Sequence, residues 1–329
     1  MTAKPVTKDC LIGHAIGDAL GVPVEFLSRE QVRSCHITEM IGGDSGVPIR
    51  SQWIMSGVPA GAWSDDTSMT VAAMAAIENE KGKIVPEHIM KNFLDWWNSG
   101  LYTSLGSPFG LGGIVSESLT RFVKGTPPLK CGGTETRHNG NGSLMRILPF
   151  SLLCIASNKS EAETVELIGI GSSLTHAHDI SKMSCFIYTE FLRILVQSKD
   201  KNAAFQHILD IDYKKYYSKE AIDALAQLLS PSFKSIKDTA ISEKNGYVVP
   251  TLESALYSIL TTTSFEQALL TSINMGYDTD TIGAVTGGLA GALYGYDAIP
   301  KRWLDKLKER QQLEELAVKY DQLLTAMHH

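Results

Sequence analysis

Two acidic segments contain the residues of this sequence that are best suited to chemistry. One is Ser64-Asp65-Asp66-Thr67 and the other is Asp278-Thr279-Asp280-Thr281, and each stands just before an apolar or small-residue helical pattern. Two carboxylates about 4 Å apart repel by roughly 4 kcal/mol at an effective dielectric constant of about 20. If the fold brings the two segments together, a divalent cation between them relieves that repulsion. The donors are all oxygen atoms, with neither Cys nor His among them, which favours Mg²⁺, Mn²⁺ or Ca²⁺ over Zn²⁺.

Helix capping is the alternative interpretation of each segment. Ser and Asp are favoured N-cap residues, and acidic side chains in the first turn of a helix complement its dipole. Short motifs often match by chance, so either segment alone favours capping. Two segments of one kind in a single chain are harder to explain in that way.

The elements that must position these segments are predicted to be helices. Apolar residues recur at helical spacing along most of the chain. Alternating strand patterns are nearly absent, and the best strand candidate, 246–250, is short. We predict one large all-α domain over residues 1–329, with a core of about 11–296 and a long amphipathic last helix over 301–327. The other predicted helices begin at capping or proline signals or follow the apolar spacing, and they cover 69–80, 86–98, the segments after the capping boxes at Ser160 and Ser264, 180–197, 221–229 and 252–261.

The segment 281–294 is predicted to be a central helix with one face made of glycines, which carry no side chains. Gly283, Gly287 and Gly291 recur at every fourth position. Glycine costs about 1 kcal/mol per helical position relative to alanine, so three in one helix require a packing reason. A second helix therefore passes very close, and Asp278 and Asp280 lie at the entrance of a buried helix.

Composition narrows the class of protein. The 329 residues are 43% hydrophobic and 20% charged, with a net charge of −6, and no basic stripe is present to neutralise nucleic-acid or membrane phosphates. The five cysteines form no CxxC pair, so neither a zinc site nor a disulfide framework is indicated. The N-terminal segment lacks the pattern of a signal peptide, and no apolar run reaches membrane-spanning length. We therefore expect a cytoplasmic protein.

Five stretches, in this order, resemble the ADP-ribosylglycohydrolase family. They are GHAIGDALGVPVE (13–25), WSDDTSM (63–69), NGNGSLMRILP (139–149), Thr175-His176 and GYDTDTIG (276–283). The family includes the bacterial enzyme that reactivates dinitrogenase reductase and the vertebrate ADP-ribosyl-acceptor hydrolases. The ordered set covers about 11–294 and is highly specific, although each motif alone is weak.

The resemblance implies an all-α fold with a binuclear Mg²⁺ or Mn²⁺ centre and an ADP-ribosylated protein as substrate. The implied reaction cleaves the glycosidic bond at ribose C1″ between ADP-ribose and an arginine or serine acceptor. It would reverse a regulatory or toxin-imposed modification. The implied metal residues are Ser64, Asp65, Asp66, Asp278, Asp280 and Thr281. Glu25 matches a family glutamate near the scissile bond, and the candidates for activating water or protonating the leaving group are Glu25, Asp65 and Asp66.

The segment Asn139-Gly140-Asn141-Gly142-Ser143 is the candidate pyrophosphate site. Its glycines allow backbone N–H groups to approach an anion, and it leads into an apparent helix, SLMRILPF, whose N-terminus attracts phosphate; an Asn-Gly turn is the alternative. Arg146 either binds phosphate, pairs with a site carboxylate or is structural. His176 matches a family histidine near the adenosine, whereas His178 is interpreted as structural. Asp18 is expected to bind local backbone, Gly17 and Gly21 to allow close packing, and Trp96 and Trp97 to lie in the core.

One position departs from the family pattern. Several members carry an Asp in an Asp-Ile-Gly segment close to the metals, and Gly110 stands at the corresponding position here. This difference leaves arginine and serine acceptors both open. It also leaves open a second hypothesis, that the protein is catalytically silent and either binds ADP-ribose or has a structural role. A third hypothesis, a binuclear phosphoesterase, follows from the oxygen ligands alone, and Glu25 and the 139–143 segment favour glycosidic chemistry over it.

Overall fold

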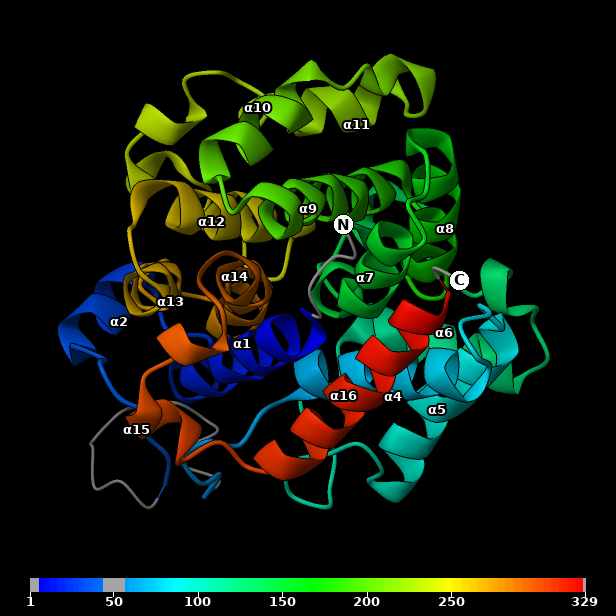
Figure 1. Ribbon diagram of the computed structural model, residues 1–329, viewed down its shortest axis with the longest axis horizontal. Helices are drawn as coiled ribbons and strands as arrows, with labels where there is room; N and C mark the ends of the chain where they lie inside the picture. The colour runs from blue at the N-terminus through cyan, green and yellow to red at the C-terminus, as the bar shows by residue number, and fades with distance from the viewer. Residues whose placement is uncertain (1–5, 44–56, 328–329) are drawn as a thin grey trace.

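Helices form all the regular secondary structure in residues 6–43 and 57–327, the parts of the chain that this computed structural model describes (Figure 1). The predicted all-α class is confirmed for these residues. The α-helices are α1 (Thr7–Gly21), α2 (Arg29–Cys35), α4 (Asp65–Asn79), α5 (Pro86–Ser99), α6 (Gly113–Val123), α7 (Leu148–Ala156), α8 (Glu161–Ser173), α9 (Asp179–Ser198), α10 (Lys201–Asp210), α11 (Lys219–Ala224), α12 (Val248–Thr261), α13 (Phe265–Ile273), α14 (Thr279–Tyr294), α15 (Lys301–Leu304) and α16 (Arg310–Ala326). The 3₁₀ turns are η1 (Val22–Val24), η2 (Pro128–Lys130), η3 (Thr136–His138), η4 (Leu144–Arg146), η5 (Tyr213–Lys215), η6 (Phe233–Ser235), η7 (Asp238–Ala240) and η8 (Tyr296–Ala298).

Helices α1 and α14 pack against each other along most of their lengths at the centre of the protein (Figure 1). Every side chain of α14 from Thr279 to Ala292 is buried. The glycines of the two helices face each other: a Cβ on Gly13, Gly17, Gly283 or Gly287 would lie closer than 3.0 Å to the backbone of the opposite helix. The predicted close helix partner is therefore confirmed, and it is α1.

The other helices surround this pair. Helices α12 and α13 pack on α14, α9 contacts α12 and α14, and α10 and α8 cover the outer side of α9. Helix α4 contacts α1, and α5 and α16 pack on α4 (Figure 1). One continuous apolar core joins all these elements. This arrangement brings the first turns of α4 and α14 to the same side of α1.

Serine caps begin several helices where the sequence predicts them. Ser160 forms the predicted capping box, in which its Oγ accepts from the Glu163 backbone N–H and Glu163 accepts from Ser160. Ser264 caps α13, but Gln267 accepts from the Thr263 backbone N–H, so only half of the second predicted box forms.

Three predicted elements differ in the structure. The expected last helix over 301–327 is two helices, α15 and α16, separated at 305–309, where Glu309 has a φ of 52°. The strand candidate 246–250 is wrong, because Val248 is the first residue of α12 and Gly246 has a φ of 65°. The helix predicted over 221–229 ends as α11 at Ala224.

The two tryptophans of α5 separate into a buried and a partly exposed residue. Trp96 is fully buried, as expected, whereas Trp97 is 41% exposed, so its placement in the core is wrong. Their positions on α5 are successive, so a helix that packs one face on the core cannot bury both.

No single helix in 6–43 and 57–327 is long and apolar enough to cross a membrane; one bent pair, Thr7–Val24 with Arg29–Cys35, passes by length and composition alone.

Candidate metal centre and active site

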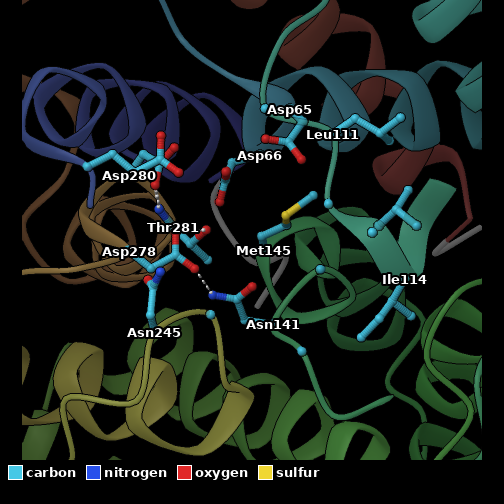
Figure 2. Close-up of a pocket in the computed structure, with 18 of the residues that line it drawn as sticks. Asp65, Asp66, Leu111, Ile114, Asn141, Met145, Asn245, Asp278, Asp280 and Thr281 are labelled. Atoms are coloured by element: carbon cyan, nitrogen blue, oxygen red, sulfur yellow. Dashed lines mark hydrogen bonds between the residues drawn. The ribbon is translucent and has the colours of Figure 1, made fainter. Parts of the chain in front are cut away.

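A cavity of about 290 Å³ opens where the starts of α4 and α14 meet (Figure 2). Segments far apart in the sequence form its walls: the end of η1, the first turn of α4, the segment before α6, the 140–142 loop, the turn before α12 and the first turn of α14. Its lining includes Glu25, Phe26, Asp65, Asp66, Gly110, Leu111, Ile114, Gly140, Asn141, Gly142, Met145, His176, Asn245, Gly246, Asp278, Asp280 and Thr281. The two acidic segments of the sequence therefore meet at one site.

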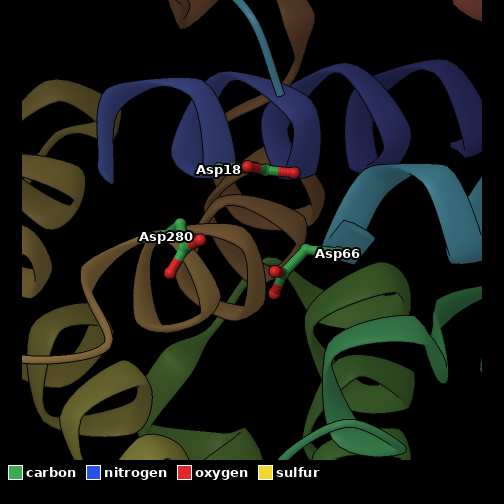
Figure 3. Close-up of side chains that lie close together, drawn as sticks. All are labelled: Asp18, Asp66 and Asp280. Carbon is green, nitrogen blue, oxygen red and sulfur yellow. The ribbon is translucent and has the colours of Figure 1, made fainter. Parts of the chain in front are cut away.

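Carboxylates converge in two groups at one end of this cavity. Asp18, Asp66 and Asp280 form the first group, and Glu25, Asp278 and Asp280 form the second; within each group one oxygen of each residue lies within 4.8 Å of the others. Figure 3 shows the first group, with one carboxylate from each of α1, α4 and α14. Asp280 is shared, so the two groups form one continuous acidic cluster.

Asp18 holds the start of α4 in place. One of its oxygens accepts from the backbone N–H and the hydroxyl of Ser64, each at 2.9 Å, and the other accepts from the backbone N–H (3.0 Å) and hydroxyl (2.6 Å) of Thr67. Asp18 does bind backbone, as expected, but the backbone belongs to residues 46 and 49 positions away rather than to its own segment. Four hydrogen bonds occupy the lone pairs of its carboxylate.

The electrostatics of the cluster are unfavourable without a cation. Burial, followed by the charges of neighbouring carboxylates, raises the pKa of Asp65, Asp66 and Asp280 well above the usual value for aspartate. Burial also raises the pKa of Asp18 to about 6, although the Ser64 and Thr67 hydrogen bonds oppose it. No Lys or Arg lines the cavity in the described parts of the chain. The cluster must therefore bind protons or a cation at neutral pH.

The donor set fits a hard divalent cation. Asp66 Oδ1 is buried and has no hydrogen-bond partner among the described residues. An unpaired buried oxygen lowers the stability of the fold unless a ligand binds to it. The other donors are held in place: Asn141 Nδ2 donates to Asp278 Oδ2 at 2.7 Å, and the Thr281 hydroxyl donates to Asp278 Oδ1 at 3.3 Å. Carboxylate and hydroxyl oxygens without sulfur or imidazole suit Mg²⁺ or Mn²⁺.

Ser64 and Asp65 lie differently from the other predicted metal residues. Ser64 is the N-cap of α4, and its Oγ lies 3.0 Å from Asp66 Oδ2. Asp65 lines the cavity but belongs to neither carboxylate group. Gly110 stands directly beside it: a Cβ at this position would lie closer than 3.0 Å to Asp65 Oδ1, and the φ of 89° favours glycine. The Asp65 carboxylate thus lies where the Cβ of a family aspartate at position 110 would be.

The 139–143 segment divides between the cavity and the interior. Gly140, Asn141 and Gly142 line the cavity. Asn139 instead accepts from the backbone N–H and hydroxyl of Ser181, and Ser143 Oγ bonds Ser172 Oγ at 3.0 Å. Asn139 and Ser143 therefore support the loop from behind.

The helix expected over SLMRILPF does not begin at Ser143. A three-residue 3₁₀ turn, Leu144–Arg146, precedes α7, so the segment offers no long helix dipole to an anion. Arg146 is fully buried and is not among the lining residues. It donates to the Gly171 carbonyl at 3.1 Å and to Thr175 Oγ1 at 2.6 Å, which is the structural alternative considered for it.

The two histidines of the 175–178 segment occupy different environments. His176 is buried and lines the cavity, where the missing side chains of Gly140 and Gly142 make room for its ring. His178 caps α9 by accepting from the Ile180 backbone N–H, consistent with its structural interpretation.

Several lining residues were not predicted from the sequence, among them Phe26, Asn245 and Gly246. Phe26 follows the first family motif directly, is 48% exposed and has a φ of 68°. Asn245 and Gly246 follow a segment without motifs and face the Asp278 side of the cavity (Figure 2). An aromatic residue directly after Glu25 is a usable sequence signal for Phe26, whereas the turn before α12 carries only an Asn-Gly dipeptide, which indicates a turn but not a site.

The described residues form an all-helical protein with a cavity walled by carboxylates, and by its sequence the chain belongs to the ADP-ribosylglycohydrolase family. The sequence profile of that family matches residues 6–329. The chain is 31% identical over 311 residues to ADP-ribosylarginine hydrolase Tri1 of Serratia proteamaculans (strain 568), covering 94% of this chain and 77% of that protein. It is 27% identical to the ADP-ribosyl-[dinitrogen reductase] glycohydrolase of Rhodospirillum rubrum, covering 92% and 90%. A solved structure titled "ADP-ribosylglycohydrolase-related protein complex" superposes with a TM-score of 0.76 at 27% identity, covering 98% of this chain and 99% of that one.

Proposed function

We propose that this protein is a metal-dependent ADP-ribosylarginine hydrolase, which cleaves the C1″–N bond between ADP-ribose and an arginine side chain of a modified protein. The observation that carries the proposal is the convergence of Glu25, Asp66, Asp278 and Asp280 at one end of a cavity lined further along by Gly140, Asn141 and Gly142. The arginine acceptor rests on the relatives named ADP-ribosylarginine hydrolase. Such an enzyme reverses a regulatory or toxin-imposed modification in the cytoplasm.

The cluster has room for two ions in this proposal. Asp66, Asp280 and the Ser64 hydroxyl would hold one, and Glu25, Asp278, Asp280 and Thr281 would hold or approach the other. Asp18 remains a positioning residue, because its four hydrogen bonds already fix α4. Bound ions would supply ribose hydroxyl binding and polarisation of the reacting centre.

Asp65 is the best-placed proton donor for the leaving guanidine. It lines the cavity, belongs to neither carboxylate group and lies directly against Gly110, where no side chain displaces its carboxylate. Burial raises the pKa of its carboxyl, which favours the protonated form that a general acid requires. Glu25, which lines the same cavity and lies close to Asp278 and Asp280, is then the candidate for orienting the attacking water.

The far end of the cavity suits the nucleotide. Gly140 and Gly142 leave the backbone of the loop open to an anion, and Asn141 fixes the loop to Asp278. Leu111, Ile114 and Met145 add apolar surface beside the loop (Figure 2). Pyrophosphate next to the loop would place ribose C1″ toward the acidic end.

The test is release of free ADP-ribose, detected by mass spectrometry, from matched peptides ADP-ribosylated on arginine or on serine. We expect release from the arginine peptide with Mg²⁺ or Mn²⁺ and none with EDTA. Asp65→Asn should bind metal as the wild type does but not turn over, whereas Asp280→Asn should lose both.

Two results would redirect the proposal. Release from the serine peptide alone would make the acceptor assignment wrong. Binding of ADP-ribose without release from either peptide would favour the silent binder, and Gly110 would be the first residue to examine.

A further inference from the structure

We infer that Arg146 and Thr175 are positioning residues that hold His176 as its Nε2–H tautomer, so that the ring donates a hydrogen bond to the pyrophosphate of the bound ADP-ribose. The inference rests on the proposed function for the identity of the ligand. It assigns a purpose to Arg146, which the sequence placed at the site and the structure places behind it.

The hydrogen-bond directions along this chain of residues follow from the chemistry of each group. Arg146 Nη2 lies 2.6 Å from Thr175 Oγ1, and a guanidinium only donates. Thr175 Oγ1 therefore accepts from Arg146. The same oxygen lies 2.8 Å from His176 Nδ1, and Thr175 is fully buried, so its hydroxyl proton has Nδ1 as the acceptor that the structure offers.

An accepting Nδ1 fixes the rest of the ring. In a neutral imidazole one nitrogen accepts and the other carries the proton, so the proton of His176 is on Nε2. Burial, followed by the charge of Arg146, lowers the pKa of His176 to about 3, so the ring stays neutral across the physiological range. The charge on Arg146 persists, since its pKa falls only to about 10.

The Nε2 atom faces the cavity. A Cβ added to Gly140 would lie 3.3 Å from it, so the glycine leaves it accessible to a ligand. Among the described residues Nε2 has no hydrogen-bond partner, although the side chain as a whole is only 1% exposed. A nearly buried donor aimed into a cavity, beside the candidate pyrophosphate loop, is left for a ligand acceptor to satisfy.

The other contacts described for Arg146 are with residues that do not line the cavity. Its second amino group donates to the Gly171 carbonyl at 3.1 Å, and its guanidinium lies over the Phe93 ring at 4.9 Å. These contacts hold the cation where its charge orients the Thr175 hydroxyl. The hydrogen bonds from Arg146 to Thr175 and from Thr175 to His176 also give the site an Nε2–H donor that is present throughout the physiological pH range.

The test combines a tautomer measurement with ligand affinity. In ¹⁵N-histidine NMR of the whole protein without ligand, assigned by comparison with His176→Gln, we expect the Nε2–H signature for His176. Thr175→Val removes the hydroxyl and should abolish that signature and weaken ADP-ribose binding about tenfold in calorimetry, the loss of one hydrogen bond to a charged group. Thr175→Ser keeps the hydroxyl and should restore both. KM should rise in Thr175→Val with kcat nearly unchanged.

The outcomes separate this inference from the proposed function. An Nδ1–H signature in the wild type, or unchanged ADP-ribose affinity in Thr175→Val, overturns the inference alone. Binding with the expected signature but without turnover overturns the proposed function alone, and failure to bind ADP-ribose overturns both. If Thr175→Val does not fold, His176→Gln, which keeps a donor, should bind ADP-ribose more tightly than His176→Leu; equal affinities would contradict the inference.

Discussion

The contact between α1 and α14 predicts that one added methyl group damages both stability and metal binding. Gly17→Ala places a Cβ closer than 3.0 Å to the Gly283 carbonyl, a backbone atom that cannot rotate away. Adding one carbon to a packed interior costs about 1–3 kcal/mol, and the high end applies against backbone. Alanine gains about 1 kcal/mol of helix propensity over glycine. The net expectation is a loss of about 2 kcal/mol in the free energy of unfolding.

Gly169→Ala is the matched control. Gly169 is also in the interior of a helix, α8, but an added Cβ there meets no atom within 4 Å. This variant should gain the propensity term of about 1 kcal/mol and lose nothing. Urea unfolding of the two proteins in EDTA should therefore separate them by about 3 kcal/mol.

Metal affinity provides the second measurement. Asp18 is carried by α1 next to Gly17, and Asp280 by α14 one turn before Gly283. Separation of the helices moves these carboxylates apart, and small misplacement of supporting groups typically costs ten- to hundredfold in affinity. We expect about tenfold weaker Mn²⁺ binding in Gly17→Ala and no change in Gly169→Ala. Equal stability of the two variants would refute the argument from close packing.

Three further predictions concern the cluster and its surroundings. Asp280→Asn removes the carboxylate that both groups share, so Mn²⁺ affinity should fall about 100-fold or more in calorimetry while the circular dichroism spectrum is unchanged. The raised pKa values of Asp65, Asp66 and Asp280 mean that the folded metal-free protein keeps protons that the unfolded chain loses above about pH 4. The melting temperature in EDTA should therefore fall as pH rises from 5 to 8, and saturating Mg²⁺ should reverse that trend; a rise with pH in EDTA would contradict the sign. Gly110→Ala forces a side chain to a φ of 89° beside Asp65, so it should cost about 1–3 kcal/mol in urea unfolding and reduce turnover more than metal binding.

Local signals in the sequence predicted the helices that carry the chemistry. The starts of α4 and α14 were expected within a few residues, because acidic and hydroxyl residues before small apolar runs indicate helix entrances. The break between α15 and α16 has no such signal. It arises from distant contacts: the Lys308 backbone N–H donates to the Gly61 carbonyl, and Trp63 Nε1 donates to the Lys308 carbonyl at 3.0 Å.

The sequence predicts the site residues whose charge is costly to bury. It does not predict the roles of residues whose hydrogen-bond partners are distant in the sequence. The acidic residues at 65–66 and 278–280 stood out because carboxylates in buried positions require compensation. The role of Asp18 depends on Ser64 and Thr67, which a pattern search within one helix cannot find. The direction in which Arg146 points is likewise set by the α8 carbonyl at Gly171 and by Thr175.

The glycine-rich face of α14 also bears on how the chain reaches its native state. A helix with four glycines between residues 283 and 291 has little stability by itself, so we expect it to form only against α1, more than 250 residues earlier in the chain. Closing a loop of that length is entropically costly and comes late in folding. The acidic cluster then assembles in the last cooperative step, and a nascent chain released before residue 279 lacks both the helix and the site. Metal ions would thus stabilise the completed fold rather than initiate its formation.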